Sequence, residues 1–415
     1  SAAQRLCHVL SNSRFLGDAL NKSVESVTWL GNDDSLQPRS RESLDIQTKA
    51  TLERNAGNIN DFANSIRAMR RHEIERIGLA WMSGVIDDEA SLAGMTDVYD
   101  AAIEASLQWA IQHRINDIQI DEAPAAIAII GMGRYGGREV NFSSDADVII
   151  IYRPAEGADD DQANLFARKV QEDLRAILQG STTFEPKIEL DMDLRPEGKN
   201  GPLVRSYASC EEYYRSWAST WEHQALLRAR YAAGDASLAE DFLMNIADPL
   251  RYPKIDLTET QIAEIRKLKA RMEAERLPRG VRRDRHLKLG KGGLSDVEWT
   301  IQLLQLQHAG DNANLRVNGT LQALNELEHR KLISAGDAVV LRKAWRMCTA
   351  ARNGSYLWSG RVNQADILPD DSYSLGGIAV YLGYDANRGQ HFENDLLAVI
   401  RKARDVTERL FYGRS

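Results

Sequence analysis

Two short apolar runs joined by a glycine-rich turn constrain the fold of this chain more than any other feature. The runs are AAIAIIG, at 125–131, and ADVIIIYR, at 146–153, and each has the pattern of a buried strand. The turn reads G-M-G-R-Y-G over 131–136, which satisfies the dinucleotide-binding pattern G-x-G-x-x-G. That pattern requires a helix after the turn, but only the residues REVNFSS follow Gly137 before the second run begins. A crossover helix needs about a dozen residues or more, so the spacing argues against a dinucleotide-binding fold.

Two acidic residues stand at the start of the second apolar run. Asp145 and Asp147 are two positions apart, so on a strand both side chains point to the same face. Two carboxylates beside a turn with free backbone N–H groups suit divalent cations that hold a triphosphate. An Asp-x-Asp pair taken alone is more often a solvated turn at the start of a strand, and that alternative stays open at this point.

The segment KIELDMDLRP, at 187–196, has the clearest strand pattern in the chain. Apolar and charged residues alternate from Ile188 to Arg195, so a strand here has one apolar face and one charged face. Asp191 and Asp193 lie on the charged face, and either can supply the further carboxylate that a two-metal nucleotidyl transfer needs. The glycine turn, the Asp-x-Asp pair and this later acid together indicate a metal-dependent nucleotidyltransferase site.

Helical patterns flank this segment on both sides. Residues 1–122 follow helical spacing, strand and helix patterns mix over 123–237, and helical patterns return over 238–415. We therefore predict an α+β fold with an N-terminal helical region, a nucleotidyltransferase core and a C-terminal helical bundle. Within the bundle, Asp256 and Glu259 have the spacing of a capping box at the start of a helix. A second long helix is predicted from the segment LSDVEWTIQLLQLQHAG, after a basic loop.

Composition and charge argue against several classes of protein. The formal net charge of −8 disfavours a nucleic-acid partner, which requires a basic face. No run approaches the roughly 20 apolar residues of a membrane helix, and the first residues lack a signal-peptide pattern. Three dispersed cysteines indicate free thiols in a reducing cytoplasm rather than a disulfide framework. Because the chain opens on Ser1 and directly on a helical pattern, we expect it to be a domain of a longer protein.

Longer motifs of this chain resemble those of a known family. In chain order they are IIGMGRYGGREVNFSSDADVIIIY, LDMDLRPEGKNGPLVRS, WEHQALLRARYAAGD and KLGKGGLSDVEWTIQLLQLQH. Together they resemble the glutamine synthetase adenylyltransferase family, within the DNA polymerase β-like nucleotidyltransferase superfamily. The resemblance implies a polymerase β-like core with a mixed sheet between the two helical regions.

The resemblance also implies an activity. In that family two homologous halves of one chain act on a tyrosine of glutamine synthetase: the C-terminal half adds AMP from ATP, and the N-terminal half removes it by phosphorolysis. A PII signal protein and glutamine regulate the balance. This chain covers one half, and WEHQALLRAR, ERLPRG and the ending after RLFYG are more similar to the adenylylating half of actinobacterial type. The de-adenylylating half and a non-catalytic regulatory module are the alternatives.

Carried over residue by residue, the resemblance assigns a site. Asp145 and Asp147 match the metal-binding pair and Asp191 matches the third acid. Many members of the family have Arg where this chain has Asp193, which leaves open whether Asp191 or Asp193 completes the site. Two Mg²⁺ ions are expected there, with the tyrosine hydroxyl attacking the α-phosphorus of ATP in line. The expected ATP-binding residues are Gly131, Gly133, Arg134, Gly136, Ser144 and Arg195.

Other polar residues in the motifs have ordinary structural explanations. Glu222 is expected to be a structural partner of an arginine, and Lys288 an exposed lysine with no specific role, although it could reach phosphate. Asp296 and Glu298 stand at the start of a helix, where acids favour the helix dipole, but the family motif raises the odds that they are functional. We expect four tryptophans to lie in the core: Trp217, Trp221, Trp299 and Trp345.

Overall fold

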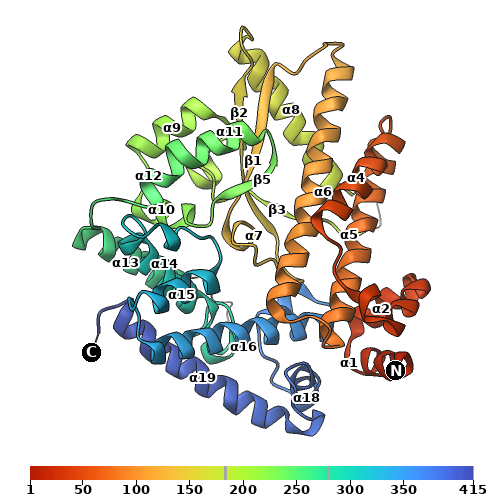
Figure 1. The fold of residues 1–415 in the computed structure, drawn as a ribbon, viewed down its shortest axis with the longest axis vertical. Helices are drawn as coiled ribbons and strands as arrows, with labels where there is room; N and C mark the ends of the chain where they lie inside the picture. Colours follow the sequence, from red (N-terminus) through yellow and green to blue (C-terminus); the bar gives the residue numbers. More distant parts are fainter. Residues whose placement is uncertain (182–184, 276, 278–279, 415) are drawn as a thin grey trace.

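The computed structural model of this chain describes residues 1–181, 185–275, 277 and 280–414. Over these residues the chain is mostly helical, with one five-stranded mixed sheet. In Figure 1 the sheet lies at the centre, the N-terminal helices stand to its right, and the C-terminal helices lie below it. This is the α+β arrangement that the sequence predicts.

The N-terminal region is built from helices that begin at clear caps. Ser13, for example, ends one helix and caps the next, because its Oγ accepts the backbone N–H of Leu16. Two long helices, α5 and α6, pack side by side and reach the sheet. The bounds are α1 (Ala2–Asn12), α2 (Arg14–Lys22), α3 (Asp33–Leu36), α4 (Arg41–Arg54), α5 (Ile59–Met82) and α6 (Asp88–Asp117), with a 3₁₀ helix at Val24–Gly31.

The sheet is organised around two antiparallel strands. Strand β1 (Ala125–Gly131) pairs antiparallel with β2 (Ala146–Pro154), and β5 (Arg230–Gly234) pairs antiparallel with the other edge of β1. Two short strands, β3 (Leu190–Asp191) and β4 (Val204–Ser206), run parallel to β2. A single helical turn, α7 (Gly133–Gly136), stands where a dinucleotide-binding fold would need a crossover helix. The antiparallel pairing of β1 and β2 therefore confirms that the dinucleotide-binding pattern was a false lead.

Each face of the sheet supports a separate core. Ile129 and Ile150 belong to a core shared with the N-terminal helices and α8, whereas Ile130 and Ile149 face the helices that follow β4. Phe242 is fully buried in that second core. The helices concerned are α7 (Gly133–Gly136), α8 (Asp160–Gln179), α9 (Tyr207–Ser216), α10 (Thr220–Leu226), α11 (Ala236–Asp241) and α12 (Asp248–Arg251), with a 3₁₀ helix at Gly198–Asn200 and a π-helix at Phe242–Ala247.

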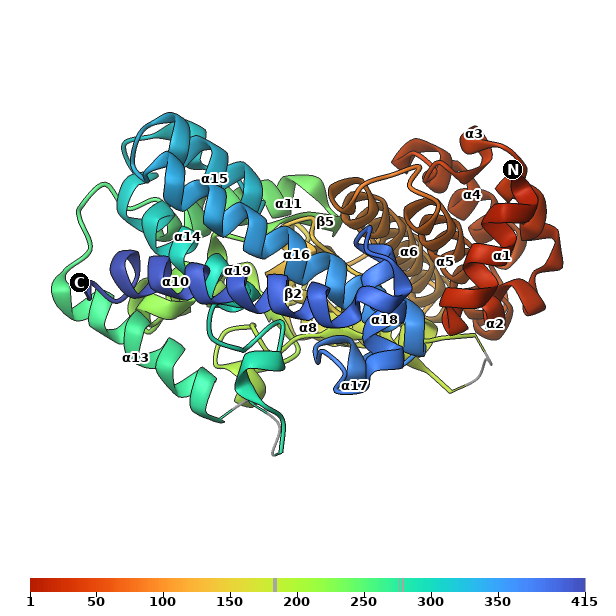
Figure 2. The same cartoon turned by 90° about the horizontal axis from the view of Figure 1, so that it is seen from below.

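The C-terminal helices form a bundle that also contacts the N-terminal region. Figure 2 shows α16 and α19 running along each other below the sheet. Helix α16 reaches α2, where the Ser13 hydroxyl donates to the carbonyl of Leu357 at 2.8 Å. None of the described helices is both long enough and apolar enough to cross a membrane. The bounds are α13 (Glu259–Glu275), α14 (Leu294–His308), α15 (Thr320–His329), α16 (Ala335–Ser359), α17 (Val362–Ala365), α18 (Ser372–Tyr381) and α19 (Gly389–Leu410), with 3₁₀ helices at Arg283–Arg285, Ala313–Leu315 and Ala386–Arg388.

The strand predicted at 187–196 is much shorter than its pattern suggests. Only Leu190 and Asp191 pair with β2, because the chain turns immediately afterwards. The Oδ1 of Asp191 accepts the backbone N–H of Asp193 at 2.7 Å, and the N–H of Arg195 donates to the carbonyl of Met192. The alternation correctly indicates which residues are buried, but a side chain that bonds its own backbone ends the strand.

Two other predictions need correction. The capping box of α13 is made by Thr258 and Gln261, whose side chains each accept the other's backbone N–H, and not by Asp256 and Glu259. Among the tryptophans, only one of the four lies in the core: Trp345 is 1% exposed. By contrast, 75% of Trp217 is exposed. The remaining two, Trp221 and Trp299, are half-buried and line a cavity.

Candidate active site

A cavity of about 800 Å³ lies between the glycine turn and the C-terminal helices. The turn, the start of β2 and α10 form one side of it, and α13, α14, α16 and the loop before α14 form the other. Its volume is in the range of small-molecule sites, and it brings together segments that are far apart in the sequence. Several of the residues expected from the sequence lie on its wall: Gly133, Arg134, Ser144, Asp145 and Asp147.

The glycine turn is in direct contact with one of the predicted acids. Gly133 has φ +53°, and a Cβ built there would lie 2.7 Å from Cγ of Asp147 and closer still to its Oδ2. The backbone N–H of Met132 donates to the carbonyl of Asp147 at 2.8 Å, which fixes the turn against β2. At Gly136 a Cβ would collide with the carbonyl oxygen of Arg228. These glycines therefore let the backbone approach β2 and α10 more closely than any side chain would permit.

The predicted acids come from two neighbouring strands. Asp147 of β2 lies opposite Asp191 of β3 in the parallel register of the two strands. Asp145 comes just before β2, and both Asp145 and Asp147 line the cavity. Burial, together with the nearby carboxylates of Asp145 and Asp191, raises the pKa of Asp147 to about 7. The site therefore holds a local excess of negative charge that a bound cation would neutralise.

The structure separates the two candidates for the third acid. Asp193 is exposed, and its carboxylate lies 3.2 Å from Nζ of Lys199 and 3.8 Å from Nη1 of Arg195. Asp191, by contrast, is the register partner of Asp147 and one of the carboxylates that raise its pKa. The geometry thus places Asp191, and not Asp193, beside the Asp-x-Asp pair.

The carboxylates of Asp145, Asp147 and Asp191 are suitable ligands for a divalent cation. Carboxylate oxygens are the donors that Mg²⁺ prefers, and a bound cation would balance the negative charge of these neighbouring acids. Over the described ranges, however, no group of three or more His, Cys, Asp or Glu side chains is already arranged to hold a metal ion. The donor set fits Mg²⁺, and binding would require these side chains to adjust.

Three cations line the cavity near these acids. Arg134 donates from Nη2 to Glu298 at 2.5 Å, and Arg352 donates from Nε to Asp366. Within the part of the chain that the structure describes, Nε and Nη1 of Arg134 and Nη1 of Arg352 are buried without a hydrogen-bond partner. Burial lowers the pKa of Lys288, as do the charges of Arg352 and Arg134 beside it. Cations gathered in this way, with unused donors, form a site for an anion with several oxygens.

Of the remaining residues predicted to bind ATP, one lines the cavity and the others do not. Ser144 lines the cavity, and its hydroxyl donates to Oδ1 of Asn141 at 2.7 Å. Gly131 and Gly136 shape the turn but do not line this cavity. Arg195 is buried below the site, where it donates at 2.8 to 3.1 Å to three carbonyl groups. Its donors hold the 192–201 loop together, so the structure gives it a positioning role rather than a place at the cavity wall.

Two motif acids have structural roles, although Glu222 does not pair with an arginine as expected. Glu222 accepts the backbone N–H of Ser219 and the hydroxyl of Tyr213, which makes it a capping residue of α10 rather than the partner of an arginine. Asp296 is fully buried, where it pairs with Lys269 and with Arg404. Both acids stabilise the walls of the site and are not exposed in it.

The sequence did not reveal all of the cations that line the cavity. Sequence reasoning gave Lys288 no specific role and did not consider Arg352 or Asp366. The available signal was weak, because a single charged residue in a long helix such as α16 is normally solvated. Arg352, however, stands in the run TAARNGSY, where small residues on every side allow close packing around a charge. Its burial at 3% exposure marks it as a functional candidate only once the fold is known.

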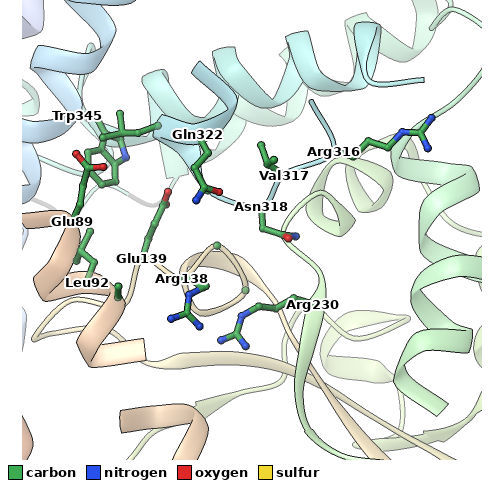
Figure 3. Close-up of a pocket in the computed structure, with 15 residues that line it drawn as sticks. Glu89, Leu92, Arg138, Glu139, Arg230, Arg316, Val317, Asn318, Gln322 and Trp345 are labelled. Carbon is green, nitrogen blue, oxygen red and sulfur yellow. The ribbon is translucent and has the colours of Figure 1, made fainter. Parts of the chain in front are cut away.

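A second, smaller cavity of about 420 Å³ lies on the opposite side of the glycine turn. Figure 3 shows Arg138 and Arg230 lying near each other beside the turn, with Trp345 across the cavity. These arginines are already paired, Arg138 with Asp97 at 2.7 Å and Arg230 with Asp100 at 2.8 Å. Among the described residues neither arginine has a buried donor without a partner, unlike Arg134 and Arg352, so this cavity is a poorer site for a polyphosphate than the larger one.

A small mixed sheet with a glycine turn, adjacent strand carboxylates and flanking helices defines a nucleotidyltransferase core. Residues 3–245 match the family model described as glutamate-ammonia ligase adenylyltransferase, and residues 265–411 match the one described as GlnD PII-uridylyltransferase. The first match covers more than half of the chain. This chain therefore belongs to the glutamate-ammonia ligase adenylyltransferase family, as the motifs indicate.

Known relatives of the chain share one description, "Bifunctional glutamine synthetase adenylyltransferase/adenylyl-removing enzyme". The protein from Bifidobacterium longum (strain DJO10A) is 78% identical over 415 residues, which cover 100% of this chain and 39% of the relative. The proteins from Leifsonia xyli and Mycobacterium tuberculosis are 42% and 40% identical, over 99% of this chain and 40% and 41% of theirs. The chain thus spans about two-fifths of the length of these relatives.

Proposed function

We propose that this chain transfers AMP from ATP to a tyrosine of glutamine synthetase and releases pyrophosphate. The observation that carries the proposal is the arrangement of the large cavity, which has carboxylates on β2 and β3 near a group of cations with unused donors. A polyphosphate bound with a divalent cation matches both groups at once. The names of the relatives, which specify glutamine synthetase, support the choice of protein substrate.

The residues of the cavity divide the work of the transfer. Asp145, Asp147 and Asp191 would hold Mg²⁺, which when bound neutralises phosphate oxygens and lowers the pKa of the attacking hydroxyl. Arg134 and Lys288 would bind phosphate oxygens of the nucleotide. The tyrosine oxygen attacks the α-phosphorus, its proton leaves to solvent, and the bond to the β-phosphate breaks. The protein then acts mainly by positioning the groups and stabilising the charge that develops on pyrophosphate.

The same cavity could serve the reverse modification. Because the relatives are described as both adenylyltransferases and adenylyl-removing enzymes, phosphorolysis is the second candidate. In that reaction orthophosphate would bind beside Arg134, Lys288 and Arg352 and attack the phosphorus of the tyrosine–AMP ester. The bond from phosphorus to the tyrosine oxygen would break, that oxygen would take up a proton, and the AMP and phosphate would leave together as ADP. We favour transfer because of the motifs that resemble the adenylylating half. Regulation by a PII signal protein stays a prediction.

One experiment distinguishes these functions. The 415-residue chain is incubated with α-labelled ATP, Mg²⁺ and unmodified glutamine synthetase, beside an Asp145→Asn, Asp147→Asn variant. An Asp311→Asn, Asp405→Asn variant is the matched control, since it removes two exposed carboxylates elsewhere. We expect label on a glutamine synthetase tyrosine with wild type and control, and none with the first variant.

A parallel reaction supplies adenylylated glutamine synthetase and orthophosphate. Release of ADP there, without label transfer in the first reaction, would establish phosphorolysis instead. If the folded chain performs neither reaction, it is a non-catalytic module and the proposal is wrong.

A further inference from the structure

The large cavity has two chemically different ends. Helix α14 lines it with Glu298 and, one turn later, Gln302, which lies about 6 Å further along the helix axis. On the facing side Gln224 belongs to α10, and Arg228 follows just after that helix ends at Leu226. On both sides of the cavity a charged residue near the glycine turn is therefore accompanied by a glutamine four residues away in the sequence.

The end away from the turn is aromatic and apolar. Trp221 and Trp299 line the cavity within one helical turn of Gln224 and Gln302, and Leu268 and Met272 of α13 line it as well. The charged residues of the cavity belong to the other end. They are connected to one another, since Arg134 pairs with Glu298 and acts on Lys288 and Asp147. A ligand that spans the cavity therefore needs a charged part and a flat apolar part.

A linked pair of amides stands within the apolar end. Nε2 of Gln224 donates to Oε1 of Gln302 at 2.8 Å. Gln224 is 3% exposed, and in the described part of the chain its Oε1 has no donor. Two amides joined by one hydrogen bond leave one carbonyl oxygen and one amino group outside that bond, whichever way they are oriented. A buried acceptor without a partner indicates that a ligand group completes the pair.

We propose that this end is the base subsite, which binds the purine ring of the nucleotide against Trp221 and Trp299. The exocyclic amino group of adenine and the adjacent ring nitrogen are a donor and an acceptor side by side, which matches the amide pair. Flat rings stack on tryptophan faces, and the phosphates then extend toward the acids and cations at the turn. This inference rests on the proposed function, because it assigns the base of a nucleotide whose phosphates lie at the glycine turn.

The test compares two ligands that share phosphates but not a base. Binding of ATP and of inorganic tripolyphosphate is measured by calorimetry in Mg²⁺, without glutamine synthetase, so that no transfer occurs. The variants are Gln302→Leu and Trp221→Leu, with Gln112→Leu as a control that removes an exposed amide from α6. We expect each cavity variant to weaken ATP binding about tenfold and to leave tripolyphosphate binding unchanged. Retained tripolyphosphate binding also shows that each variant is folded.

Three results would overturn the inference, and they differ from one another. If wild type binds ATP no more tightly than tripolyphosphate, or the variants weaken both ligands equally, this end does not bind the base although the phosphate site stands. If the variants bind ATP normally but need more glutamine synthetase for transfer, this end takes the acceptor tyrosine instead. If wild type binds neither ligand, the proposed function itself is wrong.

Discussion

Replacing Gly133 by alanine tests the contact between the glycine turn and Asp147. The new Cβ would lie 2.7 Å from Cγ of Asp147 and closer to Oδ2, whereas real Cβ atoms stay at least 3.0 Å from other heavy atoms. The carboxylate therefore has to move by roughly 1 Å. A shift of about 1 Å in a catalytic group can cost about 100-fold in rate, so we expect transfer to fall by about that factor. The positive φ costs alanine a further 1 to 2 kcal/mol or so of stability.

Gly84 provides the matched control. It has φ +69°, and no atom lies within 4 Å of a Cβ built there, so alanine meets the same backbone cost without displacing an acid. Both variants are unfolded in urea and assayed for label transfer. We expect similar losses of stability, about 1 to 2 kcal/mol, and a loss of transfer only in Gly133→Ala. Equal transfer by the two variants would refute the argument that Asp147 must lie against the turn.

Three further predictions follow from single side chains. Asp191→Asn should lower transfer at least 100-fold, about as much as a misplaced catalytic group, whereas Asp193→Asn should change it less than about threefold; the reverse order would make Asp193 the third ligand. Asp296→Asn leaves two cations without their buried partner and should cost about 3 to 5 kcal/mol in urea unfolding, with ATP affinity unchanged; a selective loss of ATP binding would give Asp296 a role in the site. Burial raises the pKa of Glu75 to about 7, so its ionised form opposes folding, and the free energy of unfolding should fall as the pH rises from about 4.5 to 7. Glu75→Gln should remove that fall and raise the melting temperature at pH 8, and an unchanged pH profile would contradict this assignment.

The elements that the sequence predicts best are those whose pattern is local. Strands β1 and β2 are buried on both faces, so their continuous apolar runs identify them without tertiary information. The segment at 187–196 shows the limit of the same reasoning. Its alternation identifies the buried side, but the bond from Asp193 to the Asp191 side chain, which ends β3, has no signature in hydrophobic periodicity.

The residues of the site likewise include some that a local motif reveals and others that only the tertiary packing reveals. Asp145 and Asp147 are recognisable because a local motif contains them, and the turn that contacts them is close in sequence. Arg352 reaches the cavity only because α16 packs across the bundle, and no pattern near that residue reports this contact. Trp221 and Trp299 were expected in the core, since hydrophobicity predicts that a side chain leaves water but not whether protein or ligand covers it.

The most direct test of the account is a structure of this chain with Mg²⁺ and a non-hydrolysable ATP analogue. The account predicts phosphates between Asp147 and Lys288, the metal on Asp145, Asp147 and Asp191, and the base at the tryptophan end of the same cavity. A nucleotide bound instead in the smaller cavity, beside Arg138 on the other side of the turn, would contradict it.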